Sequence, residues 1–311
     1  AQLDADLLVV VHADQLDHWQ ARALVAALAE GAHLALVGDP RALPPLGPGW
    51  PWADLALQAA DVALAARPGA STAALVGAAE CIARGDPLSH LVESDDLWLC
   101  PADDPEEIVD TVGEIVCERL PRQRGVTAEA VAVLCLARHG PAGAAALNAA
   151  LRARRDAGGG SAAAVRAAGR SFRPGERAIL AESVPHLALA RGTLVRVVGP
   201  ARPPGVVHIT LPDRRQVALD EADAAALDYA AALEVRQAQG GPFRAVVVPM
   251  LSEDYVTLHR RALYSAVSSA REVCVLVGQE RALAHALASA REPLRYRRLA
   301  ARLGPPPPRP A

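Results

Sequence analysis

The chain has 311 residues, of which 51% are hydrophobic and 22% charged, and its 32 basic against 35 acidic residues give a formal net charge of −3. This length is enough for one large or two ordinary globular domains. The charge balance argues against a generally basic protein that coats nucleic acid, but it leaves room for a local basic groove. The chain contains no Lys, which excludes a lysine that grips phosphate or forms a Schiff base within these residues.

The cysteines are few and dispersed, and no two of them have the spacing of a zinc-binding pair. Such a set argues for a reducing compartment and against disulfides or a zinc module, so we interpret the thiols as small buried hydrophobic residues and expect no metal site. Cys135 and His139 flank a strand end, but no third group that could orient a nucleophilic pair is apparent.

No apolar run is long enough to cross a membrane, and acidic residues stand where a signal peptide would have basic ones. We therefore predict a cytoplasmic protein with no membrane partner. Its first residue is Ala rather than Met, which suggests a fragment or a processed product.

The first part of the chain predicts a parallel α/β sheet. Residues 7–11 and 33–38 are short apolar runs typical of buried parallel strands. Between them, Asp14 stands at a helix N-cap position, which predicts a helix that ends near residue 30. The alternation continues, with helices expected over residues 72–84, 105–120 and 143–155 and strands over residues 97–100 and 130–136.

The pattern changes after residue 172. Short strands separated by Gly and Pro turns favour a small antiparallel barrel of the SH3 type, with strands at residues 177–182, 193–198, 206–211 and 216–219. Helix and buried-strand patterns then return, with helices expected over residues 222–228 and 258–269 and strands over residues 245–250 and 273–278. A final helix precedes a Pro-rich tail, residues 304–311, which we expect to be mobile.

Five segments, in order along the chain, resemble motifs of the RecD-like DNA helicases of superfamily one: DLLVVVHADQL, LALVGDPRALPPLGPG, VAVLCLARHGPAGAAALN, VRQAQGGPFRAVVVP and ALYSAVSSAREVCVLVG. The resemblance covers nearly the whole chain and implies an α/β fold with RecA-like parallel sheets of the P-loop NTPase type. Residues 1–60 would be the C-terminal half of a first RecA-like domain. Residues 61–171 and 228–303 would form a second such domain, interrupted by an SH3-like barrel at residues 172–227.

The positions at which this family carries its catalytic groups hold other residues here. Val11 and His12 replace the acid that holds Mg²⁺ and the acid that polarises the attacking water, and an alkyl side chain cannot bind a metal that needs oxygen ligands. Ala42 replaces a glutamine that senses the γ-phosphate, and Ser269 replaces an arginine finger. The resemblance leaves, as remnants of the nucleotide cleft, Gly38, Asp39, Gln239, Gly240 and Arg271.

ATP and Mg²⁺ are implied as cofactors only if an upstream segment or a partner supplies the phosphate-binding loop GxxxxGK[ST], which these residues lack. We therefore expect this chain alone to hold no cofactor. An incomplete first sheet would also leave an apolar flank for such a segment or partner protein to cover.

Arg271 lies two positions after Ser269, the arginine-finger position. On a continuing helix that spacing would place Arg271 on another face.

The resemblance implies single-stranded DNA as a partner that crosses the RecA-like domains and the inserted barrel. Arginine can bind phosphates and stack on bases. The candidate DNA contacts are Arg138, Arg173, Arg191, Arg236 and Gln237. Aromatic residues that could stack on bases are few, namely Trp50, Trp52, Phe172 and Tyr255, and we expect Trp50 and Trp52 to be partly exposed.

Three functions therefore fit the sequence. The first is a catalytically inactive pseudo-helicase, in DNA repair or recombination, that binds single-stranded DNA or scaffolds a DNA-processing complex. The second is an active ATP-dependent 5′–3′ DNA helicase or translocase, completed by an upstream segment and using His12 and Arg271. The third is a purely structural protein-interaction domain. We favour the first, because the apolar strands are intact whereas the groups that hydrolyse ATP are lost.

Overall fold

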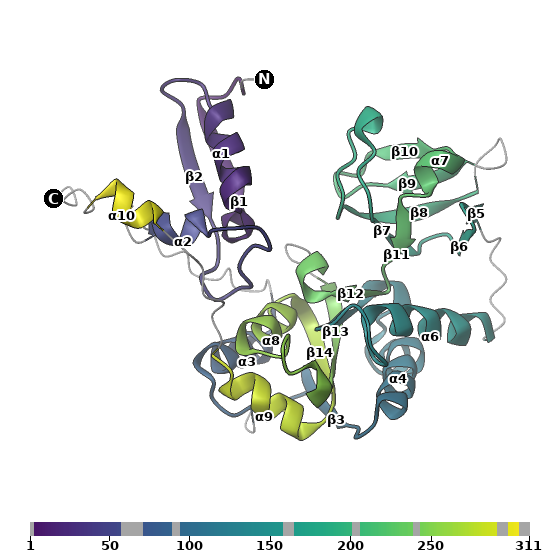
Figure 1. Ribbon diagram of the computed structural model, residues 1–311. Coiled ribbons are helices and arrows are strands. Elements are labelled where there is room, and N and C mark those ends of the chain that lie inside the picture. The colour runs from purple at the N-terminus through teal and green to yellow at the C-terminus, as the bar shows by residue number, and fades with distance from the viewer. Residues whose placement is uncertain are drawn as a thin grey trace.

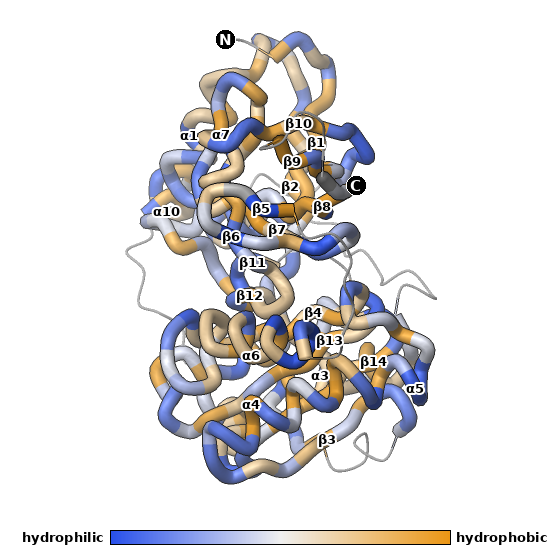
Figure 2. Tube along the Cα trace, turned by 90° about the vertical axis from the view of Figure 1, so that its right-hand side faces the viewer, coloured by the Kyte–Doolittle hydropathy of each residue, from blue (hydrophilic) through white to orange (hydrophobic). Residues whose placement is uncertain are grey.

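The computed structural model describes residues 3–56, 71–88, 94–157, 165–200, 206–238, 243–290 and 298–304. Within these ranges the chain forms an N-terminal unit (residues 3–56), a central unit (residues 71–157 and 230–290) and an inserted unit (residues 165–229). The N-terminal and inserted units both rise from the same end of the central unit (Figure 1). Hydrophobic residues follow the strands of the two larger sheets (Figure 2).

The N-terminal unit is built on two parallel strands, as the sequence predicts: β1 (Leu7–Val11), α1 (His18–Ala27), β2 (His33–Val37) and α2 (Pro51–Ala56) follow one another. The register places Val11 opposite Val37 at the carboxyl ends of the strands. Leu7, Val9 and Val11 alternate along β1 and are exposed. Parallel strands are normally covered on both faces, whereas no described residue covers this face of β1.

The predicted cap of the first helix is wrong. Asp17, not Asp14, caps α1: its carboxylate accepts from the Gln20 backbone N–H at 2.8 Å, and Gln20 Oε1 accepts from the Asp17 N–H at 3.0 Å. Asp14 lies in a short 3-10 helix, η1 (Ala13–Gln15), where its buried carboxylate accepts from the Asp39 N–H at 3.1 Å. Asp14 lies four residues before the start of α1 at His18, so it is too far along the chain to be the N-cap residue.

The central unit contains a five-stranded sheet in the order β12-β4-β13-β14-β3, and all of its paired strands run parallel. The strands are β3 (Leu97–Pro101), β4 (Val131–Cys135), β12 (Ala232–Glu234), β13 (Phe243–Met250) and β14 (Ala270–Gly278). Almost every residue of β4, β13 and β14 is buried, as expected for strands covered on both faces.

Helices cover both faces of this sheet (Figure 1). One core lies under α3 (Ala73–Arg84), α8 (Arg260–Val267) and α9 (Glu280–Ala288). The opposite core lies under α4 (Pro105–Glu114) and α6 (Ala144–Ala157). This is the RecA-like α/β arrangement that the sequence predicts.

The helix expected over residues 105–120 is not uniform. It runs as α4, a π-helical segment, η2 (Ile115–Arg119), and α5 (Leu120–Arg124), and ends at Gly125 with a φ of +60°. Pro121 has no N–H to donate to the preceding turn, and a widened turn before it relieves the clash of its ring with a carbonyl.

The inserted unit is antiparallel, as the short strands and Gly/Pro turns predict. Its sheet has the order β10-β9-β8-β7-β11 and stands on its own core, which includes Phe172 and Ile209. The elements are β5 (Val165–Ala167), β6 (Arg170–Phe172), β7 (Arg177–Leu180), β8 (Leu194–Pro200), β9 (Val207–Thr210), β10 (Gln216–Leu219), α7 (Glu221–Ala224) and β11 (Leu227–Tyr229).

The last described helix, α10 (Leu299–Leu303), packs against α2 of the N-terminal unit (Figure 1). The chain therefore returns to the N-terminal unit after completing the central one. Among the residues that the structure describes, no helix is long and apolar enough to cross a membrane. The predicted mobile tail, residues 304–311, lies outside the described residues except for Gly304.

Candidate functional site

The positions at which the resembling family carries its catalytic acids lie at the carboxyl end of β1. Val11 is 63% exposed, and His12 follows it with a left-handed backbone, φ +57°. In a parallel sheet, ligands gather at this edge. Val11 offers no atom that can ligate a metal there, and among the described residues no cluster of His, Cys, Asp or Glu side chains could hold a metal ion.

Gly38 and Asp39 lie at the neighbouring end of β2, where both make contacts that hold the structure together. A Cβ on Gly38 would lie 2.8 Å from the backbone nitrogen of Asp14, so only glycine fits between these two turns. The Asp39 carboxylate accepts from the Tyr264 hydroxyl on α8 and forms an ion pair with Arg41 at 3.2 Å. Burial and the nearby Asp39 carboxylate together raise the pKa of Tyr264 above its usual value, so this hydroxyl remains a donor.

The segment that follows, residues 39–45, which we call the docking loop, joins the N-terminal unit to the central unit. Leu43 is only 3% exposed and belongs to the core beneath α8. Its N–H donates to Ser265 Oγ at 3.0 Å, and its carbonyl accepts from Gln15 Nε2 at 2.7 Å. A side chain from one unit thus completes the hydrophobic core of the next.

Two arginines of the central unit hold the carbonyl groups of the docking loop. Arg261, on α8, donates to the carbonyls of Pro40 and Ala42, the residue at the γ-phosphate sensor position. Arg236, in the 3-10 helix η5 (Val235–Ala238), donates to the Pro44 carbonyl at 2.6 Å. The sequence marks Arg236 as a DNA contact, whereas the structure shows its guanidinium engaged in this contact between units.

Ser269, at the arginine-finger position, lies just after the C-terminal end of α8. Ser269 Oγ donates to the Ser265 carbonyl at 2.7 Å, one turn back along the chain. The helix does not continue to Arg271: α8 ends at Val267, two residues before the predicted end at residue 269, and Arg271 lies exposed at the start of β14. The remaining cleft candidates, Gln239 and Gly240, lie outside the described residues.

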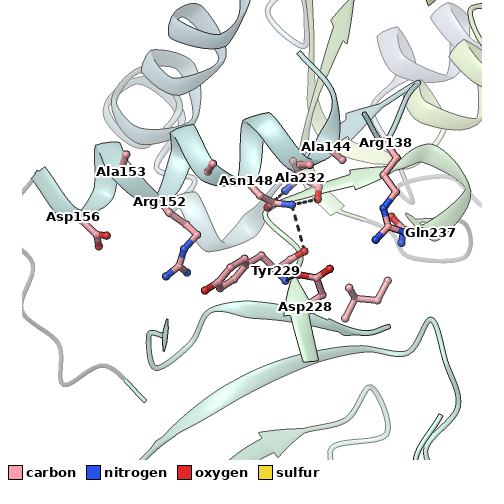
Figure 3. Close-up of a pocket in the computed structure, with 13 residues that line it drawn as sticks. Arg138, Ala144, Asn148, Arg152, Ala153, Asp156, Asp228, Tyr229, Ala232 and Gln237 are labelled. Carbon is pink, nitrogen blue, oxygen red and sulfur yellow. Dashed lines mark hydrogen bonds between the residues drawn. The ribbon is translucent and has the colours of Figure 1, made fainter. Parts of the chain in front are cut away.

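A pocket of about 560 Å³ opens between α6, the inserted unit and η5 (Figure 3). Its lining residues come from the third resembling segment and the rest of α6, from the inserted unit, and from β12 and η5: Arg138, Ala144, Ala145, Asn148, Ala149, Arg152, Ala153, Asp156, Ile179, Asp228, Tyr229, Ala232 and Gln237. Two of the five predicted DNA contacts, Arg138 and Gln237, therefore meet in one pocket although they are far apart in sequence. It lies where the loops that follow β4 and β12 converge.

The two predicted contacts differ in how they are held. Arg138 is exposed and makes no side-chain hydrogen bond or ion pair with another residue that the structure describes. Gln237 Oε1 accepts from the Glu234 N–H at 2.9 Å, which fixes the amide and leaves its NH₂ group as the part that can reach a ligand. Asn148, on α6, bridges both backbone groups of Ala232, with distances of 2.8 and 2.9 Å.

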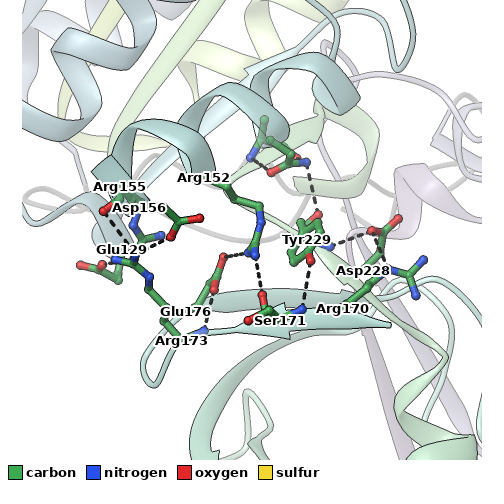
Figure 4. A network of polar contacts seen from close by, with 12 residues as sticks. Glu129, Arg152, Arg155, Asp156, Arg170, Ser171, Arg173, Glu176, Asp228 and Tyr229 are labelled. Carbon is green, nitrogen blue, oxygen red and sulfur yellow. Dashed lines mark hydrogen bonds and ion pairs between the residues drawn. The ribbon is translucent and has the colours of Figure 1, made fainter. Parts of the chain in front are cut away.

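The other charged groups around the pocket neutralise one another (Figure 4). Arg152 donates to the buried Glu176 carboxylate at 3.1 Å and to the Ser171 carbonyl at 2.6 Å, and it lies 3.8 Å from the centre of the Tyr229 ring. Arg173, a predicted DNA contact, pairs with Asp156 instead of standing free. This network fastens the inserted unit to α6.

A buried arginine adds a second fastening. Arg177, at the start of β7, is 8% exposed and donates to the carbonyls of Val131 and Glu129 in the central unit, at 3.2 and 2.8 Å. Burial lowers its pKa to about 10, so it still carries its charge at neutral pH. The last predicted contact, Arg191, is exposed on the inserted unit and does not line the pocket.

Most of the expected stacking residues are not available. Trp50 is buried, at 7% exposure, and its Nε1 donates to the Asp14 carbonyl at 3.0 Å, so the expectation of partial exposure is wrong for this residue. Trp52 is partly buried, which agrees with it, while Phe172 is fully buried. Tyr255 is exposed at 58% but does not line the pocket.

Sequence reasoning missed Arg152, Asn148 and Tyr229 at the pocket. A signal existed for two of them: Arg152 stands four residues after Asn148, which closes the third resembling segment, so the two share a face of α6. Nothing local marks Tyr229, whose position depends on how the inserted unit meets the helix.

The fold and the site define the class to which this chain is similar. Residues 229–277, from β11 to β14, match the family model of the UvrD-like helicase C-terminal domain. The five-stranded parallel sheet with helices on both faces is the RecA-like fold of helicases. The predicted resemblance to superfamily-one helicases is therefore confirmed at the level of the fold, while the RecD-like subtype stays a prediction.

Among solved structures, the chain is similar to the Pif1 helicase from Bacteroides in complex with ADP-AlF3 and single-stranded DNA, at 13% identity and a TM-score of 0.55, over 93% of this chain and 73% of that one. It also matches Bacteroides Pif1 bound to single-stranded DNA, at 12% identity and a TM-score of 0.49, over 87% of this chain and 70% of that one. A third match is Pif1 from Candida albicans, at 15% identity and a TM-score of 0.47, over 90% of this chain and 74% of that one. The fold assignment depends on the first alone. No curated protein sequence is significantly similar to this chain.

Proposed function

We propose that this chain is a helicase-like module that binds single-stranded DNA in the pocket beside α6 and that has lost the chemistry of ATP hydrolysis. The observation that carries the first half is the meeting of Arg138 and Gln237 in that pocket. An exposed guanidinium that has no partner among the described residues is suited to a phosphate. The similar Bacteroides protein is described with single-stranded DNA bound, which supports this class of ligand.

The second half of the proposal is supported by the side chains at the motor positions. Val11 cannot ligate Mg²⁺, and the Ser269 hydroxyl donates a hydrogen bond to the carbonyl of Ser265 in α8. The docking loop, where a γ-phosphate sensor would stand, is instead packed on α8 through Leu43. The docking loop therefore forms an interface between two units at the place where a helicase would need side chains that contact the γ-phosphate and respond to its hydrolysis.

We also propose that a further α/β layer, from an upstream segment or a partner protein, covers β1. The support is the row of exposed Leu7, Val9 and Val11, because two parallel strands with a bare apolar face are not expected to persist in water. If this layer carried a phosphate-binding loop, it would complete the nucleotide site of an active helicase, which is the competing function.

The finer family assignment belongs to this proposal. In the inserted unit, β7 to β10 pair in sequence and β11 returns beside β7, with Leu227 opposite Leu180. Such a meander with a returning fifth strand is what an SH3-like barrel requires. It supports the RecD-like subtype, and it is from that resemblance that we propose a role in DNA repair or recombination.

The binding test compares Arg138→Ala with the unchanged protein on a fluorescent oligonucleotide. Loss of one charge-assisted phosphate contact should weaken binding by about tenfold and reduce the slope of log Kd against log salt by about 0.7. Since Arg138 has no side-chain partner among the described residues, the midpoint of thermal unfolding should not move.

The matched control is Arg122→Ala. This substitution removes the same charge from an exposed position on α5 that does not line the pocket. The affinity of the Arg122→Ala variant for the oligonucleotide should therefore stay within about twofold of that of the unchanged protein. Equal losses in both variants would show that only the overall charge matters. Absence of binding by the unchanged protein would leave the protein-interaction domain as the better account.

A further inference from the structure

The inserted unit and the central unit fold around separate cores. The core of the inserted unit, which includes Phe172 and Ile209, holds no described residue of the central sheet. Among the buried residues of the inserted unit that the structure describes, Ile179 on β7 alone joins the core beneath α8, and the partly buried Leu194, its partner on β8, packs against that core. Little apolar surface would therefore be exposed if the two units separated, and each would keep its own core.

The rest of the joint between these units is polar and follows one face of α6. Asn148, Arg152 and Asp156 stand four residues apart, so they lie in a row on that face, as Figure 3 shows. Asn148 is the inner end of the row. It donates to the Tyr229 carbonyl at 3.4 Å and to the Ala232 carbonyl at 2.8 Å, where the chain crosses back to the central unit. This contact fixes the crossing segment, residues 229–232, and marks it as a hinge.

The outer end of the row forms two ion pairs across the joint, which we call the α6 latch (Figure 4). Arg152 pairs with the buried Glu176 at 3.1 Å, and Asp156 pairs with Arg173. Both partners stand in the short segment between β6 and β7, where Glu176 also accepts from the Arg173 backbone N–H at 2.8 Å. One turn of the inserted unit therefore carries both partners of the latch.

The composition of the latch favours an attachment that can open. Its charged side chains are well hydrated when the surfaces separate, whereas apolar side chains are not. Solvent already reaches both pairs, because the side chain of Asp156 is 64% exposed and that of Arg152 is 21% exposed. A joint that is mainly polar and has a small apolar part resembles a transient interface more than a permanent one.

We propose that the α6 latch is releasable: the inserted unit swings away from the outer end of α6 about the hinge at residues 229–232, and returns, while both units stay folded. The pocket beside α6 has Ile179, Asp228 and Tyr229 of the inserted unit as one wall, so opening of the latch widens this pocket. The inference concerns the joint and names no ligand, so it stands or fails separately from the proposed function.

The test measures a distance across the joint by pulsed electron paramagnetic resonance. Nitroxide labels are attached at two exposed positions, Arg122→Cys on α5 and Glu182→Cys on the inserted unit, after the partly exposed Cys81, Cys100 and Cys117 are replaced by Ser. With the latch intact, we expect one predominant distance between the labels.

Removal of both ion pairs, by Arg152→Gln combined with Asp156→Asn, should add a second distance and raise the ratio of open to closed molecules by about tenfold or more. The same single distance in this double variant overturns the inference, because the pairs would then not hold the inserted unit. Far-UV circular dichroism of the double variant should match that of the unchanged protein. A lost signal would show that the pairs maintain the fold and not the joint, and would also overturn it.

The matched control is Arg155→Gln. Arg155 lies three residues after Arg152 on α6 and forms an ion pair with Glu129 at 2.6 Å, but this pair lies within the central unit. Its loss should leave the distribution of label distances unchanged. An equal second distance in the control would show that any lost charge loosens α6, and would contradict the assignment of the latch.

Discussion

Two arginines of the pocket carry the same charge and serve different purposes. Arg152 is held between a buried carboxylate and an aromatic ring, so its role is to fix the inserted unit against α6. Arg138 is exposed and without a side-chain partner among the described residues. A charge already satisfied inside the protein has little left to give a ligand, whereas an unsatisfied one retains its full attraction for phosphate. Availability, not residue type, distinguishes the two.

The buried thiols provide a prediction at this scale. Burial raises the pKa of Cys135 and raises that of Cys274 to about 12. Because the thiolate is the reactive form, burial keeps both thiols protonated and unreactive at pH 8. We expect a chromogenic disulfide reagent at pH 8 to react in the native protein only with the partly exposed Cys81, Cys100 and Cys117.

Partial burial raises the pKa of Cys100 and that of Cys117, so raising the pH should speed the reaction of these two thiols. All five cysteines should react after unfolding in denaturant, which is the internal control. Rapid labelling of Cys135 in the native protein would contradict its interpretation as a buried, inert thiol and reopen the pairing with His139.

At the scale of elements, the docking loop carries a buried contact between the N-terminal and central units. Leu43→Ala removes a side chain that is 3% exposed from the core beneath α8, and should lower the free energy of unfolding by about 2–5 kcal/mol. Leu46→Ala, three residues on and 81% exposed, should change it by less than about 0.5 kcal/mol. Denaturant titration followed by circular dichroism measures both, and equal effects would show that the loop is not docked.

Prediction from sequence succeeds here where the signal is local. The strands of the central sheet are apolar runs flanked by turn residues, and β4, β13 and β14 lie where those runs predict. The break in the helix at η2 also had a local signal, Pro121, which the amphipathic pattern of residues 105–120 masked.

The contacts that decide the site are not local. Arg236 follows a strand and is basic, which makes it resemble a DNA contact, but its partner is a carbonyl in the docking loop. Trp50 follows a Gly/Pro turn typical of exposed residues, yet packing of η1 buries it. In both cases the partner comes from a distant part of the chain, and no periodicity or spacing near the residue reveals it.

For the whole molecule, the same end of the central unit receives both neighbouring units (Figure 1). The docking loop fixes one of them and the network around Arg152 fixes the other. Translocation by a helicase needs units that move with the nucleotide, whereas these contacts tie the units together through side chains and backbone carbonyls. These contacts agree with the proposed function, in which the molecule holds a single strand and does not move along it.

The most direct test of this account is the rate of phosphate release from ATP in the presence of Mg²⁺, measured on the full-length natural protein with an oligonucleotide at a concentration that saturates binding. The account predicts bound strand and a rate no higher than that of buffer, because Val11 and Ser269 cannot supply the metal ligand or the cation that phosphoryl transfer needs. Magnesium-dependent turnover that the oligonucleotide accelerates, with both residues unchanged, would contradict it.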